Sequence, residues 1–229
     1  MSEYIKIKRG LNLKLIGEAA KTVLDLPVAE IFAIKPKDFV GLTPKLLVKA
    51  GANVEAGTPL FYDKNNKKIQ FCSPVSGEVI EILRGQKRVI LEIKILADRE
   101  IKQLGFTKSN PNQLSRQEII DLLLNSGVWP FIRQRPYGTI ANPSESPKAI
   151  FISAFDTNPL APDTDFIMSG KESYFQTGIN ALKQLTTGKI HLNVQANTAP
   201  APAFSQAQNV QINTISGPHP AGNVGVQIH

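Results

Sequence analysis

"LFYDKNNKKIQFCSPVSGEVIEIL", residues 60–83, is the stretch that decides the fold of the first half of this chain. Apolar and polar residues alternate along it, and two polar turns interrupt it. The first turn carries an Asp-Lys pair and two asparagines, and the second is Ser73-Pro74-Val75-Ser76-Gly77. Alternation bounded by Gly, Pro and Asn is typical of β-strands joined by hairpins. The stretch therefore predicts two similar β-turn-β halves.

The flanking sequence continues this pattern. Short apolar runs such as "KLLVK" and "RVILEIKIL" are separated by turns that contain Gly, Pro or Asn. Gly51 and Gly57 lie six residues apart, where tight corners need the positive φ that glycine adopts without strain. Two β-turn-β halves of this kind resemble the barrel-sandwich of lipoyl- and biotin-type carrier domains. We predict an all-β barrel-sandwich over residues 1–108.

Lys64 is the residue on which a carrier function would depend, because a carrier lysine holds its cofactor covalently at the tip of a tight hairpin. Several features argue against that chemistry. Ten residues separate Lys64 from Pro74, the Met-Lys-Met triplet of biotin-type domains is absent, and Asn65 stands where lipoyl domains carry a small apolar residue. We expect a lengthened, Asn-rich surface turn, and a covalent carrier domain with modified Lys64 remains the alternative.

Residues 109–147 have the pattern of a connector between two domains. "SRQEIIDLLLNSG", residues 115–127, predicts a short helix that Ser115 and Glu118 begin as a capping box and Gly127 ends. The Pro- and Ser-rich sequence "PYGTIANPSESP" then predicts a loop.

From residue 148 the periodicity changes to that of an α/β domain. Three apolar strands are predicted, and between the first two lies a helix with one apolar face that ends at Gly188. The strands and the helix are expected at residues 148–155, 171–186, 189–196 and 209–216. Strand, helix and strand in this order predict a parallel sheet, so we assign residues 148–229 to a partial Rossmann-like domain. The fold class is therefore α+β and multidomain.

The Gly- and Pro-rich ending "GPHPAGNVGVQIH" looks like a functional loop that leads into a helix. Because no closing element follows it, we expect a fragment of a longer chain, truncated at its C-terminus.

Composition indicates a soluble globular chain: hydrophobic residues make up 42% and charged residues 20% of it. No apolar run is long enough to span a bilayer, no signal sequence is visible, and Cys72 is the single cysteine. We therefore expect a cytoplasmic protein. Residues 1–108 contain 19 of the 26 Lys and Arg residues but 12 of the 19 Asp and Glu residues, so they carry all of the +7 net charge.

A basic half next to a neutral half indicates either a solvated surface or one that meets anionic headgroups, an acidic partner or nucleic acid. Nucleic-acid binding would need aromatic side chains among the basic ones on one face. The apolar pattern explains Phe61 and Phe71 as core residues, so we expect no nucleic-acid partner.

Two loops of the second half are candidate ligand sites, because open α/β sheets bind ligands beyond the carboxyl ends of their strands. "DTNPLAPDTD" contains Asp156 and Asn158, and "GPHPAG" contains His219. A strand-capping Asx turn and a structural histidine are equally open interpretations. Neither loop has a dinucleotide or Walker motif. We predict no metal site and no catalytic residue in this chain.

Several stretches, in order along the chain, resemble one family. They include "IKIKRGLNLKLIG", "LLNSGVWPFIRQRPYG", "KAIFISAFDTNPLAPD" and "SGPHPAG". The chain resembles the A subunit of the sodium-translocating NADH:quinone reductase, which is longer than this chain. That family is related to the C subunit of Rnf complexes and to the flavin-binding subunit of respiratory complex I. The resemblance implies a barrel-sandwich domain followed by a Rossmann-like domain.

The flavin-binding relatives carry a Gly-rich loop and an acidic Glu-x-Glu-Pro loop. The matching stretches here are "NSGVWPFIRQRP" and "DTNP", in which Val128, Trp129 and Phe131 largely replace the glycines and Asn158 stands at the second acidic position. The resemblance therefore implies a relative that kept the flavin fold and holds no tightly bound cofactor. NADH, flavins and ubiquinone are then used by the whole complex.

The resemblance also implies a peripheral subunit on the cytoplasmic face of a bacterial inner membrane. The complex reduces ubiquinone with NADH and moves Na⁺ out of the cytoplasm. Its other subunits, especially a membrane-embedded flavin-carrying one, are the expected partners. The alternatives are a flavin-binding module that uses the Asp156 loop, or a quinone-binding module in which Trp129 and Phe131 line an apolar slot.

Overall fold

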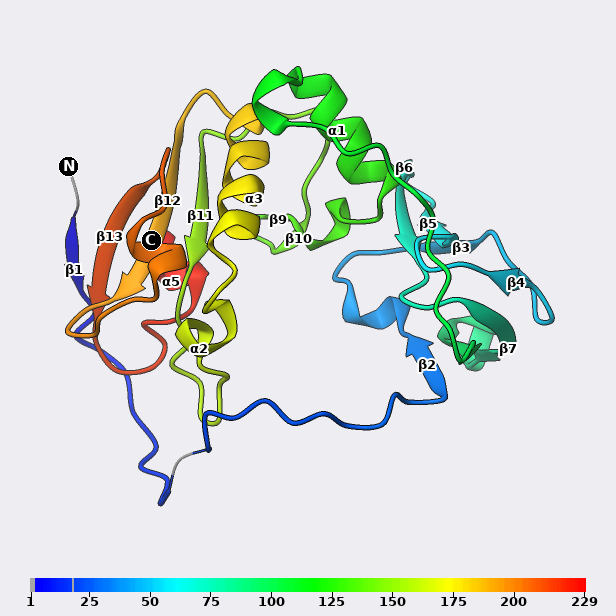
Figure 1. Cartoon of the computed structure of the whole chain (residues 1–229), viewed down its shortest axis with the longest axis horizontal. Helices are drawn as coiled ribbons and strands as arrows, with labels where there is room; N and C mark the ends of the chain where they lie inside the picture. The colour runs from blue at the N-terminus through cyan, green and yellow to red at the C-terminus, as the bar shows by residue number, and fades with distance from the viewer. Residues whose placement is uncertain (1–2, 18) are drawn as a thin grey trace. The chain divides into compact units, whose positions relative to one another are not determined.

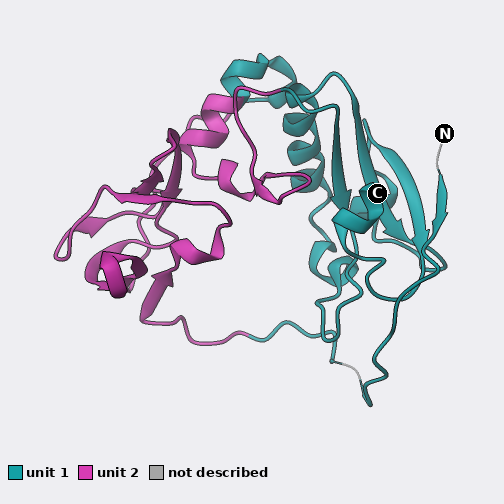
Figure 2. Cartoon of the chain, turned by 180° about the vertical axis from the view of Figure 1, so that it is seen from behind, with its two compact units in different colours: residues 1–24, 109–119, 146–229 teal, residues 25–108, 120–145 magenta. Residues whose placement is uncertain are grey.

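The computed structural model describes residues 3–17 and 19–229. The chain forms two compact units (Figure 2). Unit 1 consists of residues 1–24, 109–119 and 146–229, and unit 2 of residues 25–108 and 120–145. The barrel segment is thus inserted, in sequence, into the α/β unit.

Unit 2 is built from short strands and single helical turns (Figure 1). Its elements are β2 (Ile31–Ile34), η1 (Pro36–Asp38), β3 (Pro44–Leu46), β4 (Asn53–Val54), β5 (Pro59–Asp63), β6 (Asn66–Cys72), β7 (Gly77–Arg84), η2 (Gln86–Arg88), β8 (Ile90–Ala97), η4 (Trp129–Phe131), β9 (Arg133–Gln134) and β10 (Thr139–Ile140). Two sheets carry most of them, with strand orders β2-β8-β7-β4 and β3-β5-β6. The predicted all-β barrel-sandwich is confirmed.

Alternation places one face of β6 and of β7 in the core of unit 2, whereas consecutive Leu60 and Phe61 of β5 are both buried where its register shifts. Its most buried side chains include Leu60, Phe61, Ile69, Phe71, Val79, Ile93 and Ile95. Gly77, with φ +149, joins the second turn to β7, and a Cβ there would lie 1.9 Å from the Leu96 carbonyl oxygen. Gly51 and Gly57 have positive φ, as predicted. The glycines therefore fix the corners, and the alternating residues fill the interior.

Unit 1 has a sheet whose strands all run parallel, in the order β1-β13-β12-β11 (Figure 1). Its elements are β1 (Tyr4–Lys6), η3 (Pro111–Gln113), the start of α1 (Arg116–Asn125), β11 (Ala149–Ser153), α2 (Thr164–Met168), α3 (Glu172–Leu185), β12 (Lys189–Gln195), α4 (Pro202–Ser205), β13 (Gln211–Ser216) and α5 (Val224–Ile228). The predicted parallel sheet and the helix between its first two predicted strands are confirmed.

The first residues of the chain belong to unit 1, whereas we predicted a barrel domain that starts at residue 1. Tyr4 pairs with Thr214 and Lys6 with Ser216, so β1 extends the parallel sheet beyond β13. Gly217, with φ +139, allows the close approach, because a Cβ there would lie 2.3 Å from the Ile7 carbonyl oxygen. This pairing joins residues 210 positions apart, and no local pattern in "EYIKIK" reports it.

Helix α1 begins as the capping box predicts. The Ser115 hydroxyl and backbone N–H both donate to Glu118 Oε2, at 2.6 and 2.7 Å, and the Glu118 N–H donates to Ser115 Oγ at 3.3 Å. These bonds, led by that of the Ser115 side chain, hold the pKa of Glu118 below its ordinary value. Gly127, with φ +71, follows the helix.

A row of polar side chains crosses one face of the unit 1 sheet, where apolar ones are usual. Ser153, Asn193 and Asn213 are neighbours in register on three adjacent strands. Asn213 donates to Asn193 Oδ1 at 2.9 Å, Asn193 donates to Gln227 Oε1 at 3.0 Å, and Gln227 donates to Ser153 Oγ at 2.9 Å. This amide row attaches α5 to the sheet, and its bonds satisfy groups whose burial would otherwise be costly.

Replacing Asn193 by Ala should lower the free energy of unfolding by about 1–3 kcal/mol, because the partner amides of Asn213 and Gln227 lose a buried hydrogen bond. Urea unfolding followed by circular dichroism measures the change. Thr187→Ala, at an exposed position of unit 1, is the control and should alter stability by less than about 0.5 kcal/mol. Equal effects of the two substitutions would contradict a supporting role for the row.

Candidate functional site

The two candidate loops meet through Thr157, beyond the carboxyl ends of β11 and β13. Thr157 Oγ1 accepts the Gly222 N–H at 2.9 Å and lies 3.0 Å from His219 Nδ1. The structure thus brings His219 to the loop that contains Asp156 and Asn158, with Thr157 as the link.

Gly222 permits this contact between the loops. A Cβ on residue 222 would lie 2.4 Å from the Thr157 backbone nitrogen and 2.8 Å from Asp156 Cα. Side chains cannot occupy such distances, so only glycine allows the two backbones to approach this closely.

Asp156 and Asn158 form the strand-capping turn that was one of the two interpretations of this loop. Asp156 Oδ1 accepts the Asn158 N–H at 2.8 Å and the Asn158 side-chain amide at 2.7 Å. Both residues are exposed. The Asp156 carboxylate therefore holds the loop conformation, as in an Asx turn.

The N-terminal segment lies against the His219 loop. The Leu11 N–H donates to the His219 carbonyl oxygen at 3.0 Å, and the His219 N–H donates to Asn12 Oδ1 at 2.9 Å. Gly10, with φ +150, allows the approach, since a Cβ there would lie 2.0 Å from the His219 carbonyl oxygen. The chain's own residues therefore occupy the carboxyl end of β13, where related folds bind ligands.

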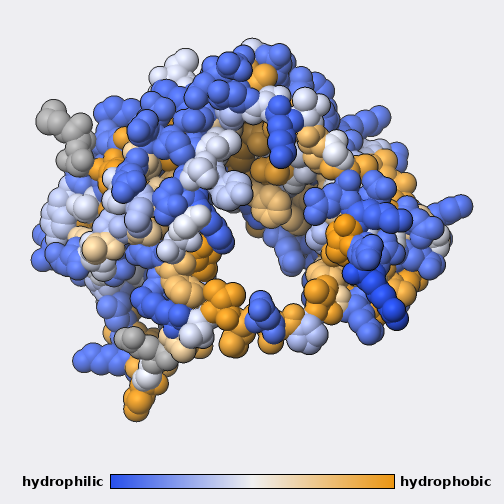
Figure 3. Space-filling model, in the orientation of Figure 1, coloured by the Kyte–Doolittle hydropathy of each residue, from blue (hydrophilic) through white to orange (hydrophobic). Residues whose placement is uncertain are grey.

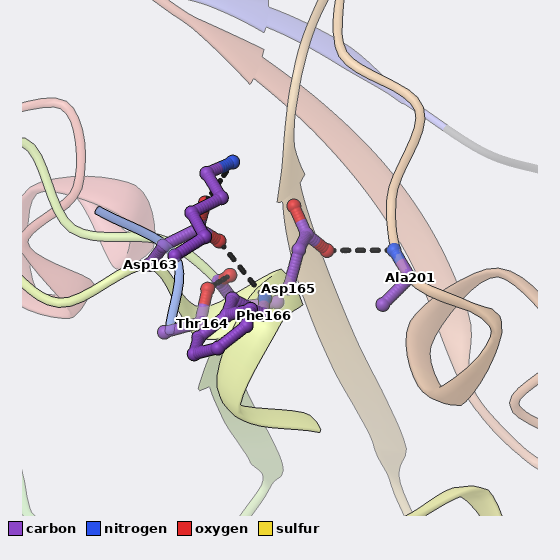
Figure 4. Close-up of polar contacts among 7 residues, drawn as sticks. Asp163, Thr164, Asp165, Phe166 and Ala201 are labelled. Atoms are coloured by element: carbon purple, nitrogen blue, oxygen red, sulfur yellow. Dashed lines mark hydrogen bonds and ion pairs between the residues drawn. The ribbon is translucent and has the colours of Figure 1, made fainter. Parts of the chain in front are cut away.

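Helix α2 fastens the end of the Asp156 loop to the neighbouring strand ends (Figure 4). Asp163 caps the helix by accepting the Phe166 N–H at 3.0 Å, and the Thr164 hydroxyl donates to the Ala154 carbonyl oxygen. Asp165 Oδ1 accepts the Ala201 N–H at 2.6 Å. These side chains therefore have structural roles: they join α2 to the residue that follows β11 and to the residue that precedes α4.

An ion pair joins the N-terminal segment to α2. Lys21 Nζ lies 2.6 Å from Asp163 Oδ2. The hydrogen bond with Lys21, followed by that with the Phe166 N–H, holds the pKa of Asp163 below its ordinary value of 3.8. The N-terminal segment is thus attached at His219 and at Asp163.

Trp129 and Phe131 lie in unit 2, and their surroundings differ. Trp129 is buried, and its indole N–H donates to the Ala141 carbonyl oxygen at 2.8 Å. Phe131 is 71% exposed. The structure therefore packs the Trp129 indole as a core side chain and presents Phe131 at the surface.

Phe131 ends a row of aromatic rings that starts in the barrel core. Ring centroids are 4.6 Å apart between Phe61 and Phe71, 4.6 Å between Phe71 and Phe39, and 6.2 Å between Phe39 and Phe131. The Arg133 guanidinium lies 5.7 Å from the Phe39 ring centroid, in cation–π geometry. Phe61, Phe71, Phe39 and Phe131 form an aromatic row, in which Phe131 packs edge-on against Phe39.

The hairpin that carries Lys64 is shorter than predicted. Asp63 pairs with Asn66, so the turn consists of Lys64 and Asn65 alone, and the residues expected in a lengthened turn belong to β6. Asp63 Oδ1 accepts the N–H groups of Asn65 and Thr43, at 3.1 and 3.4 Å, and these bonds tighten the turn. Lys64 therefore stands at a hairpin tip, which is the position that carrier chemistry requires.

The remaining reactive groups are the possible metal ligands and the thiol of Cys72. Among residues 3–17 and 19–229, no three His, Cys, Asp or Glu side chains are grouped as metal ligands would be. Burial raises the pKa of the Cys72 thiol, which disfavours the reactive thiolate. No helix in this described part of the chain is long and apolar enough to cross a membrane.

Sequence reasoning missed Thr157, Asn12 and Asp163, which hold the loops together. The local sequence around a single polar loop residue does not indicate which distant residue it will contact. The amide row was also missed, although polar residues alternate within the strands "KIHLNVQ" and "QINTIS". That alternation is the signal that could have indicated it.

Two family models together match most of the chain. The model described as the NqrA N-terminal barrel-sandwich hybrid domain matches residues 5–98, and the one described as the NqrA second alpha/beta domain matches residues 114–229. This chain belongs to the NqrA family. The family resemblance and the order of the two folds predicted from the sequence are confirmed.

Curated relatives agree with this assignment. Proteins named as the A subunit of Na(+)-translocating NADH-quinone reductase are similar over 98% of this chain: that of Photorhabdus laumondii is 39% identical, that of Tolumonas auensis 38% and that of Rhodopirellula baltica 35%. The chain covers 50% of each of these proteins. It therefore spans about half the length of the curated relatives that it matches.

Asp163→Asn should remove the ion pair with Lys21 but keep the helix cap, because Asn is an equally good N-cap residue. The folded-state pKa of Asp163 is lowered, so this group stabilises the fold above pH 3.8 and loses the effect as pH falls through the lowered value. Thermal unfolding is measured between pH 3 and 7. The wild type should have a higher Tm than the variant at pH 5–7, and the difference in Tm should shrink toward pH 3.

Lys21→Gln is the matched variant and should reproduce the same profile, and the double variant should add little to either single one. A gap that stays constant down to pH 3, or two fully additive losses, would contradict the ion pair as its source.

Trp129→Ala should destabilise unit 2 by about 3–5 kcal/mol, because it removes a buried indole and its hydrogen bond. Phe131→Ala should cost less than about 1 kcal/mol, because most of its ring is already exposed. Urea unfolding monitored by circular dichroism compares the two. Similar losses would show that Phe131 is packed as deeply as Trp129.

Proposed function

We propose that this chain is a docking part of a Na⁺-translocating NADH:quinone reductase, peripheral to the membrane and without a redox cofactor of its own. The observation that carries the proposal is the occupation of the carboxyl end of β13 by the chain's own N-terminal segment. In open α/β sheets a nucleotide or flavin binds there, and here Leu11 and Asn12 bond to His219. NADH, flavins and ubiquinone then belong to the whole complex.

The stretch that replaces the Gly-rich loop supports the same conclusion. A flavin phosphate needs a loop whose backbone N–H groups are open to it. Here Trp129 and Pro130 are buried within that stretch and fill it with side chains. The Asp156 carboxylate is engaged by Asn158 in its own turn.

Exposed aliphatic side chains on the N-terminal segment favour a docking role. Six of them lie between residues 11 and 24 and are 55–106% exposed: Leu11, Leu13, Leu15, Ile16, Val23 and Leu24. Figure 3 shows orange atoms at its lower left, where Figure 1 draws this segment in blue. Contiguous exposed apolar groups mark surfaces that another molecule covers, and Lys8, Arg9 and Lys14 add positive charge beside them.

The subunits of such a complex are the partners that fit this surface. A membrane-embedded, flavin-carrying subunit is the main expected partner, because a docking subunit without its own cofactor would have to bind the subunit that carries one. The basic excess of residues 1–108 suits the cytoplasmic face of a bacterial inner membrane, whose anionic lipids attract lysine and arginine.

A quinone-binding module is the second candidate, and the aromatic row favours it. Phe131 exposes most of its ring, and Arg133 lies over the neighbouring Phe39 ring. A flat quinone head stacks on an exposed aromatic surface of this kind. Saturable binding of a short-chain ubiquinone analogue that Phe131→Ala abolishes would favour this candidate over docking alone.

The native mass spectrum of the purified chain should match its sequence mass of 25.0 kDa, and the denatured spectrum should match it as well. If both masses match the sequence mass, Lys64 is unmodified and unit 1 holds no tightly bound flavin. The same sample should not oxidise NADH. A mass increase that survives denaturation would instead establish a covalent carrier, and one lost on denaturation would establish a bound cofactor.

The docking role is tested on membranes that contain the remaining subunits. Leu13→Asp combined with Leu15→Asp should reduce co-purification of the chain with them by about tenfold or more, since charges replace the apolar contact. Leu160→Asp, at a position 90% exposed outside the segment, is the control. Undiminished co-purification of the double variant would remove the segment from the docking surface.

A further inference from the structure

We propose that the free edge of β11 and the apolar groove beside it receive an additional strand, which pairs parallel to β11. β11 is the last strand of the unit 1 sheet (Figure 1) and, within the described residues, pairs with β12 alone. This inference goes beyond the proposed function and does not depend on it.

The edge of β11 has none of the features that keep an edge strand from pairing. Its sequence is Ala149-Ile150-Phe151-Ile152-Ser153, which has no charge and no proline, and its pairing with β12 shows no bulge. All five residues are only half-buried. Such an edge presents unpaired backbone groups and apolar side chains to the next strand.

A groove of about 400 Å³ adjoins this edge on the side of α3, and its lining is almost wholly apolar. It is formed by Ile152 of β11, Met168 of α2, and Phe175, Gly178, Ile179 and Leu182 of α3. Lys171 and Tyr174 also line it. An added strand would direct alternate side chains toward α3. Aliphatic residues at these alternate positions would fill the groove.

Gly178 is a second, independent sign of a close neighbour. It lies in the middle of α3, where glycine is less favourable to the helix than alanine. Nothing described lies within 4 Å of the place where its Cβ would be, so no contact within unit 1 requires glycine there. A chain that packs against the groove would approach the helix at this position.

Helix α5 indicates the direction of the added strand. The helix follows β13 but lies over β11, the edge strand two positions away in the sheet. There Gln227 donates to Ser153 Oγ at 2.9 Å. A connection that crosses a sheet in this way joins parallel strands. The curated relatives are about twice as long as this chain, and their second half is the natural source of such a strand.

Hydrogen–deuterium exchange at the β11 backbone tests the proposal. The 229-residue chain is compared with a chimera in which the second half of the Photorhabdus laumondii relative follows residue 229. The β11 amides should exchange at least about tenfold more slowly in the chimera, because their free edge is then hydrogen-bonded. A folded chimera with unchanged exchange at β11 would overturn the proposal.

Two leucine substitutions in α3 provide a matched pair. Gly178→Leu should abolish the added protection of β11, because its side chain enters the groove. Thr177→Leu, at the neighbouring exposed position outside the groove lining, should preserve it. Equal effects of the two variants would overturn the assignment of the groove.

If the chimera does not fold, a donor-strand fusion decides the question. The sequence Thr-Val-Val-Val-Thr is attached to residue 229 through a flexible Gly/Ser linker, and it should protect β11 unless Gly178→Leu is present. Absence of protection in this fusion would count against the proposal. Protection that rises with concentration in the unmodified chain would assign the edge to a second copy instead, and would also overturn the proposal.

Discussion

Buried amide groups must be hydrogen-bonded, and the α/β unit depends on that requirement. The amide row of Asn213, Asn193, Gln227 and Ser153 joins three strands and α5 by side-chain bonds. Gln227 also donates to the Ala221 carbonyl oxygen at 2.9 Å, and Ser153 donates to that of Phe155 at the same distance. The row therefore reaches both loops that contain Thr157 and His219, and their geometry rests on it.

The loops at the strand ends of unit 1 are held by contacts with each other and with the N-terminal segment. A fold that binds a ligand at its strand ends keeps backbone N–H groups and space available there. Here Thr157 is bonded to Gly222, and the N-terminal segment is bonded to His219, so the position is filled by protein. Exposed apolar side chains are found on the N-terminal segment, at Leu160 of the Asp156 loop and at the end of the aromatic row.

The features predicted correctly from the sequence are those with local causes. Gly51 and Gly57 give positive φ at corners, the capping box begins α1, and the periodicity locates the strands of both units. The features missed depend on partners far apart in the chain. β1 pairs with β13, Asn12 bonds to His219, and Lys21 bonds to Asp163. The Lys64 turn was misjudged because asparagine is common in turns, although Asn66 pairs as a strand residue here.

The place of β1 in the sheet has a consequence for synthesis on the ribosome. Tyr4 is made 210 residues before its partner Thr214, which at about 5–20 residues per second is a delay of roughly 10–40 s. Residues 25–108 emerge within that interval, so most of the barrel unit is available to fold before the α/β sheet can close. β1 can therefore take its place in the sheet only after β13 has been made.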